Sequence, residues 1–600
     1  MSKKNDAMRD ALLNAVEAKQ AKDKKKKKQA SFPAGGFLSL PFEQQIEVCP
    51  CKPVGINGSS FFYVDASKQL RELAAEKHSP RGITSLFVPS SYVLPELFPH
   101  FNKNGDVDGF DCNAAANFLM DACARKGIWD SAYKERGVGA WPADDGGLVF
   151  HCGDKILRVS KDGSEKWFEP GEIDDYIYPA QAKTPRPAES DKDADADAAE
   201  LRALFEKWNF AAGRDLAAHL LVGWVGAAML SGALDWRPSI WIMARAGSGK
   251  STLQNVIRAL FGKNGIVKAA DATEAGIRQT LKNSTLPVSF DEAEAEEENK
   301  RQSKILALVR IAASGDVSLR GSEGHSAKMF ALRSPFFFSS ILPPPMENAD
   351  ADRILILSLK KADGVEPIID PQRLERIGQS IKRRMIDGWP YFRDRFQAFR
   401  ERLAAEGIKE PRYLDQFGTL LACADIALHP PKEEFYLDEE EDAFIKRTKQ
   451  LCAEIKIENE SDAKRCLNKL MTSVTDTWRS GSKKLISELI DEVRQGTDDA
   501  KDAEDVLERN GMRIFSRRLT TTGVEVRFLF VANQHDGLRK IFDGTKWAGK
   551  GSTIGGWVNA LRQLEVPNTS EAIRCGKMTQ RGTTFVLDDL VPAADGGADA

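Results

Sequence analysis

The clearest hydrophobic pattern along the chain is an apolar run that ends just before residue 245 and is followed by a glycine-rich segment. Ser239–Met243 is an apolar run of β-branched and aromatic residues, which predicts a buried strand. Further on, apolar side chains recur at helical spacing, as Leu253, Val256, Ile257 and Leu260, which predicts a helix. A short glycine-rich segment separates the two. The pattern therefore predicts a strand, a tight loop and a helix in direct succession.

The same alternation of strands and helices continues beyond this point. Strands are predicted at 266–270, 286–290, 334–341 and 354–357, and helices at 273–281 and 292–313. Two short apolar segments, 317–320 and 328–332, flank a glycine-containing turn and predict a β-hairpin. At least four core strands alternating with helices predict a doubly wound α/β sheet.

Shifts in composition divide the rest of the chain. The expected parts are a basic tail at 1–30, a mixed α+β N-terminal domain at 31–181, a linker at 182–197, a helical collar plus the α/β core at 198–370, a helical lid region at 371–495 and a small C-terminal domain at 496–600. The linker is proline-rich and then acidic, as connecting segments often are. The lysine run of the tail indicates a solubilising arm or a non-specific phosphate contact.

The bulk composition is that of an ordinary soluble protein. The chain has 600 residues, of which 42% are hydrophobic and 29% charged, and a net charge of −3, so any contact with nucleic acid has to come from local patches. Nine cysteines without a C-x-x-C pair indicate reduced thiols and no zinc site. Leu216–Leu234 is uncharged, but its Ala and Gly content favours a buried helix over a membrane span. We expect a cytoplasmic protein without a membrane partner, because no secretory signal opens the chain.

The loop after the first strand has the composition of a phosphate cradle. It reads Ala-Arg-Ala-Gly-Ser-Gly-Lys-Ser over Ala244–Ser251, with alanine where the usual pattern has its first glycine. Backbone N–H groups of such a loop face the phosphates, Lys250 would reach the β- and γ-phosphates, and the Ser251 hydroxyl would ligate Mg²⁺. The candidate nucleotide-binding residues are Ala246, Gly247, Ser248, Gly249, Lys250, Ser251 and Thr252.

Two carboxylates follow the predicted strand at 286–290. Asp291 is expected to hold Mg²⁺ through water, and Glu292 to polarise the attacking water. An Asp-Glu pair alone usually marks a solvated turn, but here it ends a strand downstream of a phosphate loop. The sequence therefore predicts an ATPase with ATP and Mg²⁺ as cofactors.

Several motifs between residues 240 and 360 together resemble the AAA+ ATPase core. They are the phosphate loop, the Asp-Glu strand end, the hairpin, a strand that ends in polar Ser339 and Ser340, and the later Arg353. The hairpin just before the polar strand end is similar to that of superfamily 3 and Cch-like ring helicases of prophages and mobile elements. The resemblance implies a P-loop NTPase core, a hexameric ring and a C-terminal winged-helix-like domain.

The resemblance also implies roles for individual residues. His325 and Lys328 would contact DNA from the hairpin tip, with Arg320 near them. Ser339 or Ser340 stands where the family's sensor asparagine is expected, and Arg353 matches the finger that reaches a neighbour's γ-phosphate. Simpler interpretations are that the hairpin charges are merely exposed and that Arg353 pairs with Asp350 or Asp352. Basic residues near the C-terminus would form a winged-helix surface or be scattered solvated charges; they are Arg539, Lys540, Arg562, Arg574, Lys577 and Arg581.

Two functions follow from these observations. The first is an ATP-hydrolysing ring motor that translocates on single-stranded DNA and unwinds duplex for replication of a phage or mobile element, with a primase as a further candidate partner. The second is a nucleotide-driven AAA+ switch or assembly ATPase, regulatory or defensive, without helicase activity.

Overall fold

The computed structural model describes residues 36–245, 247–269, 272–291, 300–315, 317–321, 327–341, 346, 350, 352–364, 370–430, 439–458, 462–476, 483–518, 523–548 and 555–591. The chain forms two compact units, Met1–Cys452 and Ala453–Ala600. The expected basic tail at 1–30 lies outside the described residues. All nine cysteines are free thiols.

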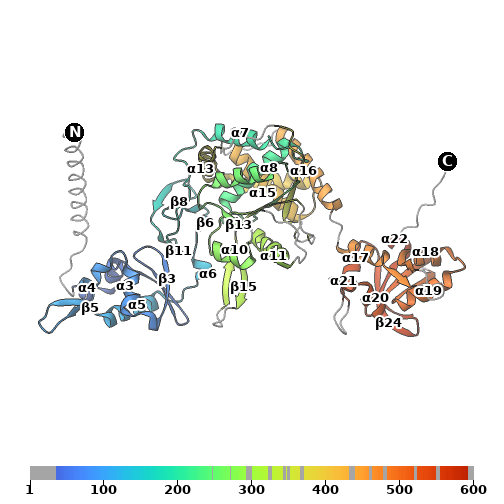
Figure 1. Cartoon of the computed structure of the whole chain (residues 1–600), viewed down its shortest axis with the longest axis horizontal. Helices are drawn as coiled ribbons and strands as arrows, with labels where there is room; N and C mark the ends of the chain where they lie inside the picture. Colours follow the sequence, from blue (N-terminus) through green and yellow to red (C-terminus); the bar gives the residue numbers. More distant parts are fainter. Residues whose placement is uncertain are drawn as a thin grey trace. The chain divides into compact units, whose positions relative to one another are not determined.

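The N-terminal part of the first unit combines short helices with antiparallel strands (Figure 1). Its helices are η1 (Phe37–Ser39), α2 (Phe42–Val48), η2 (Ala75–Lys77), α3 (Pro80–Phe87), η3 (Ser91–Val93), α4 (Leu94–Leu97), α5 (Cys112–Lys126) and α6 (Ser131–Lys134). Its strands are β1 (Lys52–Asn57), β2 (Ser60–Val64), β3 (Leu70–Ala74), β4 (Pro99–Phe101), β5 (Val107–Phe110), β6 (Gly139–Pro142), β7 (Leu148–His151), β8 (Ile156–Val159), β9 (Glu165–Phe168), β10 (Gly171–Ile173) and β11 (Tyr176–Tyr178). They pair as β1-β2-β3, β4-β5, β6-β7-β8-β9 and β10-β11.

A five-stranded parallel sheet forms the core of the α/β region. Its order is β13-β14-β17-β12-β18, with β12 (Ser239–Ala244), β13 (Val267–Ala269), β14 (Val288–Phe290), β17 (Phe336–Ser340) and β18 (Ile354–Leu359). The predicted strands and the mixed α/β class are confirmed. Between the strands lie α9 (Lys250–Phe261), α10 (Glu274–Leu281) and α11 (Lys300–Ser314), and the hairpin of β15 (Val317–Gly321) and β16 (Ala327–Ala331) is antiparallel as predicted.

The strand order explains why helices cover both faces of this sheet. The connection from β12 to β13 runs toward one edge, and the later connections return toward the other. Right-handed crossovers in opposite directions place their helices on opposite faces. On one face, α10 and α11 bury Ile277 and Leu308 against Trp241 and Phe338. On the other, α9 and α8 (Arg214–Leu230) pack on the sheet, and the ring centroids of Trp224 and Phe337 are 5.1 Å apart.

The apolar segment at 216–234 forms most of α8, as a buried helix. Every residue from Leu216 to Leu230 is buried, and α8 packs closely against α15 (Pro411–Leu428). A side chain at Gly223 would lie 2.1 Å from the Leu420 carbonyl oxygen, so the two helices need glycine at their closest approach. Among the described residues, none of the helices combines the length and apolar character that crossing a bilayer requires.

The proline-rich segment at 182–190 is bonded to the structure on both sides. Thr184 N–H donates to the Cys152 carbonyl and Ala188 N–H to the Gln379 carbonyl, each at 3.0 Å. The acidic half of the predicted linker begins α7 (Ala194–Phe205). Proline and acidic residues interrupt the helical pattern of the sequence, but two backbone N–H groups of this segment still donate to carbonyls of neighbouring elements.

Helices form the rest of the first unit, and the second unit is mixed. The helices of the first unit are α13 (Pro371–Asp387), α14 (Trp389–Ala405), α15 and α16 (Glu439–Glu458). Helix α16 continues beyond Cys452, the last residue of the first unit. The second unit contains α17 (Asp462–Met471), β19 (Val474–Asp476), β20 (Lys483–Leu485), α18 (Ile486–Gln495), α19 (Ala500–Arg509), β21 (Met512–Arg518), β22 (Glu525–Ala532), α20 (Asp536–Ile541), α21 (Gly556–Leu561), β23 (Asn568–Cys575), β24 (Met578–Val586) and α22 (Leu587–Leu590).

The second unit begins earlier than the sequence analysis expected. Cys466 of α17 and Ile486 and Leu489 of α18 are buried in one cluster with Leu529 and Phe585 of the sheet. Residues 462–495 therefore belong to this core, although their helical pattern groups them with the preceding helices. In this unit α18 and α19 precede the hairpin of β21 and β22, and β24 and β23 extend that hairpin into a four-stranded antiparallel sheet, β21-β22-β24-β23.

Candidate nucleotide-binding site

The loop between β12 and α9 is a tight turn that requires glycine at two positions. Gly247 and Gly249 have φ of +77° and +81°, in the left-handed region that favours glycine. Ser248 is buried, and its hydroxyl donates to the Arg245 carbonyl at 2.6 Å. Lys250 is the first residue of α9, with Gly249 as its N-cap. The loop thus delivers Lys250 and Ser251 to a helix N-terminus, where unpaired N–H groups favour anions.

Trp208, which the sequence analysis missed, fixes the end of this loop. Its indole N–H donates to the Gly249 carbonyl at 2.9 Å, and the side chain is only 4% exposed. A Cβ at Gly249 would lie 2.9 Å from the Trp208 Nε1. Gly249 is therefore needed both for its backbone conformation and for the space that Trp208 occupies.

The loop lies at the topological switch point of the sheet. β12 sends its connection toward β13, whereas its neighbour β17 continues in the other direction to β18. Ligands of open α/β sheets bind outside the carboxyl ends of the strands at such a point. Met243 at the end of β12 pairs with Ser340 at the end of β17, and Asp291 directly follows β14 on the far side of β17. The sheet thus brings the loop, Asp291 and the polar end of β17 to one edge.

A buried side-chain network joins these three parts. The amide of Gln254 on α9 donates to the Phe290 carbonyl and to the Ser339 hydroxyl, both at 2.9 Å, and accepts from the Ser289 hydroxyl at 2.8 Å. Gln254, Ser289 and Ser339 are 0% exposed. Both the amide nitrogen and the amide oxygen of Gln254 therefore form hydrogen bonds, as expected for a buried polar side chain.

The network ends on the candidate metal ligand. Ser339 donates to Asp291 Oδ1 at 3.0 Å, and Arg258 of α9 lies 3.9 Å from Asp291 Oδ2 while donating to Ser289 at 3.0 Å. Asp291 is thus held in place by Ser339 and lies close to the positive charge of Arg258. The sequence analysis did not identify Gln254, Arg258 or Ser289. The one sequence feature that could have indicated them is that each is polar and lies within or beside a predicted apolar strand or helix face.

The structure separates the two serine candidates. Neighbouring residues of a strand point to opposite faces. Ser339 points to the α9 face and bonds Asp291, whereas Ser340 accepts from the Trp241 indole at 2.8 Å on the face covered by α10 and α11. Ser339 is therefore the serine of the site, and Ser340 packs in the core.

Other predicted site residues lie outside the described residues. These are Ala246, Glu292 and His325; Arg320 and Lys328 are described only as backbone positions of β15 and β16. In the hairpin ladder, Arg320 and Lys328 are directly opposite each other.

Arg353 lies at the opposite edge of the sheet from the loop. It precedes β18, whose first residue, Ile354, pairs with Ser239 at the start of β12. The length of β12, about 17 Å at ~3.3 Å per residue, separates this edge from the phosphate loop. Arg353 is therefore not brought together with Lys250 and Asp291 of the same chain.

The carboxylates near Arg353 are engaged by two other arginines. Arg310 of α11 donates to Asp350 Oδ1 at 2.7 and 2.9 Å, and Arg412 of α15 donates to Asp352 at 3.2 Å. Burial lowers the pKa of Arg353 from its ordinary value, and the positive charges of Arg412 and Arg310 lower it further. Three arginines thus cluster where the parallel strands begin, which we call the amino edge of the sheet.

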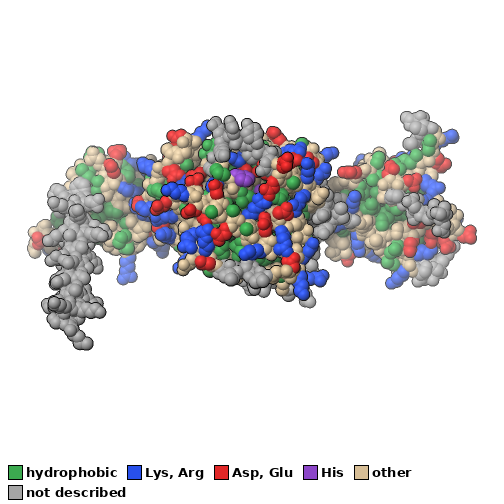
Figure 2. Space-filling view, turned by 90° about the horizontal axis from the view of Figure 1, so that it is seen from above, with side chains coloured by type: hydrophobic (Ala, Val, Ile, Leu, Met, Phe, Trp, Pro, Cys, Tyr) green, Lys and Arg blue, Asp and Glu red, His purple; other side chains and the backbone are tan. Residues whose placement is uncertain are grey.

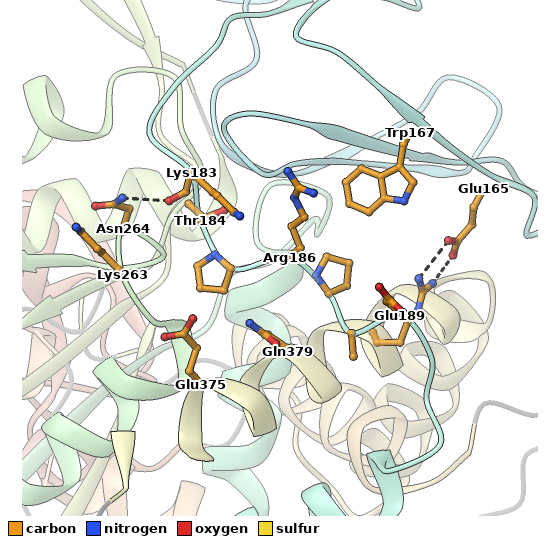
Figure 3. A pocket seen from close by; sticks show the side chains of 14 residues that line it. Glu165, Trp167, Lys183, Thr184, Arg186, Glu189, Lys263, Asn264, Glu375 and Gln379 are labelled. Carbon is orange, nitrogen blue, oxygen red and sulfur yellow. Dashed lines mark hydrogen bonds and ion pairs between the residues drawn. The ribbon is translucent and has the colours of Figure 1, made fainter. Parts of the chain in front are cut away.

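A cavity of about 840 Å³ lies apart from this site, between β9, the 182–190 segment and α13 (Figure 3). Its charges are largely balanced: Arg383 pairs with Glu165, and Arg186 stacks at 5.6 Å from the centroid of Trp167 while pairing with Asp154. None of the residues predicted from the sequence lines it.

One group of metal-type side chains occurs among the described residues. Asp425, His429 and Glu441 have ligand atoms within 4.8 Å of one another. Asp425 is already paired with the buried Arg395 and accepts from His429 at 2.9 Å. Because the positive charge of Arg395 neutralises the Asp425 carboxylate, we assign no metal ion to this group.

Comparisons with known proteins give no family. No family model matches the chain, and no curated protein matches it. Among solved structures it is similar to apo structures of the NrS-1 C-terminal region. The first has 12% identity and a TM-score of 0.35, covering 91% of this chain and 99% of that one; a second has 12% identity and a TM-score of 0.34, covering 90% and 97%. TM-scores of this size establish no common fold, so any function has to be inferred from the site itself.

Replacing the centre of the buried network should destabilise the first unit. Gln254→Leu keeps the side chain's size but removes the side-chain donor to the buried Phe290 carbonyl and the acceptor for the Ser289 hydroxyl proton, at about 1–3 kcal/mol each. We expect a clearly lower melting temperature by calorimetry. Gln397→Leu on the exposed face of α14 is the matched control and should change stability by less than about 0.5 kcal/mol. Equal melting of the two variants would show that the network contributes nothing.

Proposed function

We propose that this chain is an ATPase that binds ATP and Mg²⁺ at the loop before α9 and works as a ring motor on single-stranded DNA. The observation that carries the proposal is the meeting of a glycine-dependent loop, Lys250, Asp291 and Ser339 at the switch point of a parallel sheet. Each element has a role in phosphoryl transfer, where catalysis consists mainly of positioning and charge stabilisation.

The residues present fit a magnesium nucleotide. The Ser251 hydroxyl and the Asp291 carboxylate are oxygen ligands of the type that Mg²⁺ prefers. Lys250 and the first N–H groups of α9 hold the phosphates, and Mg²⁺ supplies charge neutralisation there when bound. Ser339 fixes the orientation of Asp291, and Gln254 fixes Ser339. Glu292, next to Asp291 in sequence, takes the role of general base for the attacking water.

The amino edge of the sheet supports an active site shared between subunits. Arg353 is too far from its own phosphate loop to contact a nucleotide there, so as a finger it acts on the nucleotide of a neighbouring subunit. Such a residue makes hydrolysis depend on assembly, which favours a closed homo-oligomer, as proposed from the ring-helicase resemblance.

The hairpin supports the motor over the switch. Arg320 and Lys328 are a directly opposed pair in the β15–β16 ladder, and like charges directly opposite destabilise a hairpin. Binding of a DNA phosphate at these two positions would offset that cost. We therefore propose that the hairpin, with His325 at its tip, contacts single-stranded DNA, and that the motor serves replication of a phage or mobile element. A nucleotide-driven switch remains the alternative and differs in showing no stimulation by DNA.

Removing the loop lysine should abolish nucleotide hydrolysis. In Lys250→Ala the β- and γ-phosphates lose their cation, so we expect ATP turnover to fall to background in a phosphate-release assay. Lys263→Ala is the matched control, an exposed lysine just beyond the other end of α9, and should hydrolyse ATP like the wild type. Undiminished turnover in Lys250→Ala would refute the nucleotide site.

The arginine at the amino edge should act in trans. Arg353→Ala should bind ATP normally but lose roughly 10³-fold or more in turnover, as other arginine fingers do. Mixing it with Lys250→Ala subunits should restore part of the activity, because each subunit supplies what the other lacks. Arg376→Ala, an exposed arginine of α13, is the control. If mixing restores nothing, the shared site is wrong.

Reversing one hairpin charge should separate the fold of the hairpin from its function. Lys328→Glu places opposite charges at directly opposed positions of the ladder. The variant hairpin should be more stable than the wild-type hairpin by about 0.2–1 kcal/mol. Basal ATPase activity should persist, whereas its stimulation by oligothymidylate should be lost. Stimulation equal to wild type would remove the hairpin from the DNA path, and a wild type without any stimulation would favour the switch.

A further inference from the structure

In the second unit the sheet is rich in basic residues, and two of the helices, α18 and α19, are rich in acidic ones. Strands β21 to β24 and the turn between β23 and β24 carry seven basic residues and two acidic ones, whereas α18 and α19 carry seven acidic residues and three basic ones. On the first unit, basic and acidic side chains are interspersed over the face seen in Figure 2. The sheet of the second unit therefore carries an excess of positive charge.

Register places part of this charge on a single face of the β23–β24 hairpin. Arg574 is opposite Thr579, and Arg581 is opposite Ala572, and directly opposed residues share a face. All four of these residues are exposed. Lys577 lies in the turn that joins the strands and is also exposed.

A fourth cation joins this face from a helix end. Arg562, which follows α21, donates to the Thr583 hydroxyl at 2.9 Å and to the Ser570 hydroxyl at 3.2 Å. Ser570 and Thr583 are directly opposed and belong to the same face as Arg574 and Arg581. We call Arg562, Arg574, Lys577 and Arg581 the hairpin patch.

The only carboxylate of the two strands points away from the hairpin patch. Glu571 alternates with Ser570 and Ala572 and so lies on the other face. There it pairs with Arg517 of β21 at 2.7 and 3.2 Å. The patch face instead contains small or hydroxyl side chains between the cations. Its exposed part offers charged donors together with the hydroxyl groups of Ser570 and Thr579, without a large apolar side chain between them.

We infer that the hairpin patch binds the phosphate backbone of DNA. Arginine, lysine and hydroxyl groups are the side chains that contact phosphate and sugar oxygens, which position a protein on nucleic acid without reading its sequence. A protein partner would be expected to need an apolar core in its interface, which this face lacks. Single strand and duplex present the same phosphodiester, and the experiment below separates them.

The site is on strands and not on the helix that a winged-helix domain would use. α19, which follows α18 in the position of a recognition helix, carries Asp502, Glu504, Asp505 and Glu508. Asp502, Glu504 and Asp505 would repel a phosphate backbone there, whereas the Glu508 carboxylate accepts from the Gly576 N–H at 3.0 Å and pairs with Arg513 at 3.3 Å. The inference goes beyond the proposed function, since it does not depend on nucleotide binding or on the β15–β16 hairpin.

Salt-dependent binding by the full chain tests the inference. Arg574→Ala, Lys577→Ala and Arg581→Ala are combined, and binding of fluorescent oligothymidylate and of a duplex is measured by anisotropy without nucleotide. Each lost contact lowers the slope of log affinity against log salt by about 0.7 for single strands and about 0.9 for duplex. We expect the slope to fall by about two if the patch binds single strands and by nearly three if it binds duplex, and affinity at ~0.1 M salt to fall about 100-fold or about 500-fold, respectively.

A matched variant controls for the loss of three charges. Lys464→Ala, Lys469→Ala and Lys501→Ala remove exposed lysines from α17 and α19 of the same unit and should leave both slope and affinity unchanged. Unchanged DNA binding by the triple variant of the hairpin patch, or an equal loss of binding in the lysine control, would overturn the inference. Basal ATP hydrolysis should be the same in all three proteins, so a failure here is distinguishable from a failure of the proposed ATPase.

Discussion

The amide of Gln254 is the contact on which the candidate site depends. It ties α9, the helix that starts at Lys250, to the ends of β14 and β17 through three hydrogen bonds in a fully buried position. In a low-dielectric interior such bonds are strong and expensive to leave unmade. The loop before α9, the Asp291 carboxylate and the Ser339 hydroxyl are therefore held together, and a shift of α9 would be transmitted to both strand ends.

A second constraint fixes the loop from the other side. Trp208 comes from the segment after α7, and the neighbouring backbone bonds to the end of β18, with Ala211 N–H donating to the Ser358 carbonyl at 2.9 Å. The loop thus lies between the buried network and a segment that leads into α8. Such pre-organisation suits a site whose task is positioning, because little order has to be created when a ligand binds.

The parallel sheet also sets what each edge can do. All five strands run in one direction, so loop, carboxylate and Ser339 gather at the carboxyl edge while Arg310, Arg353 and Arg412 gather at the amino edge. One chain cannot bring the two groups together. The proposed action of Arg353 on nucleotide therefore requires a neighbouring chain whose carboxyl edge faces this arginine.

Local patterns in the sequence were sufficient for the strand, loop and helix around Lys250, for the β15–β16 hairpin and for the burial of α8, because hydrophobic spacing and glycine positions act over a few residues. Tertiary structure decided everything that depends on distant strands. The choice of Ser339 over Ser340 follows from which face of β17 meets α9, and neither residue differs from the other in sequence pattern. The roles of Gln254 and Trp208 arise from partners 36 and 41 residues away. The position of Arg353 on the far edge follows from parallel pairing, and the hairpin patch from the register of β23 and β24, since strand order and register are set by packing and not by the composition of any one segment.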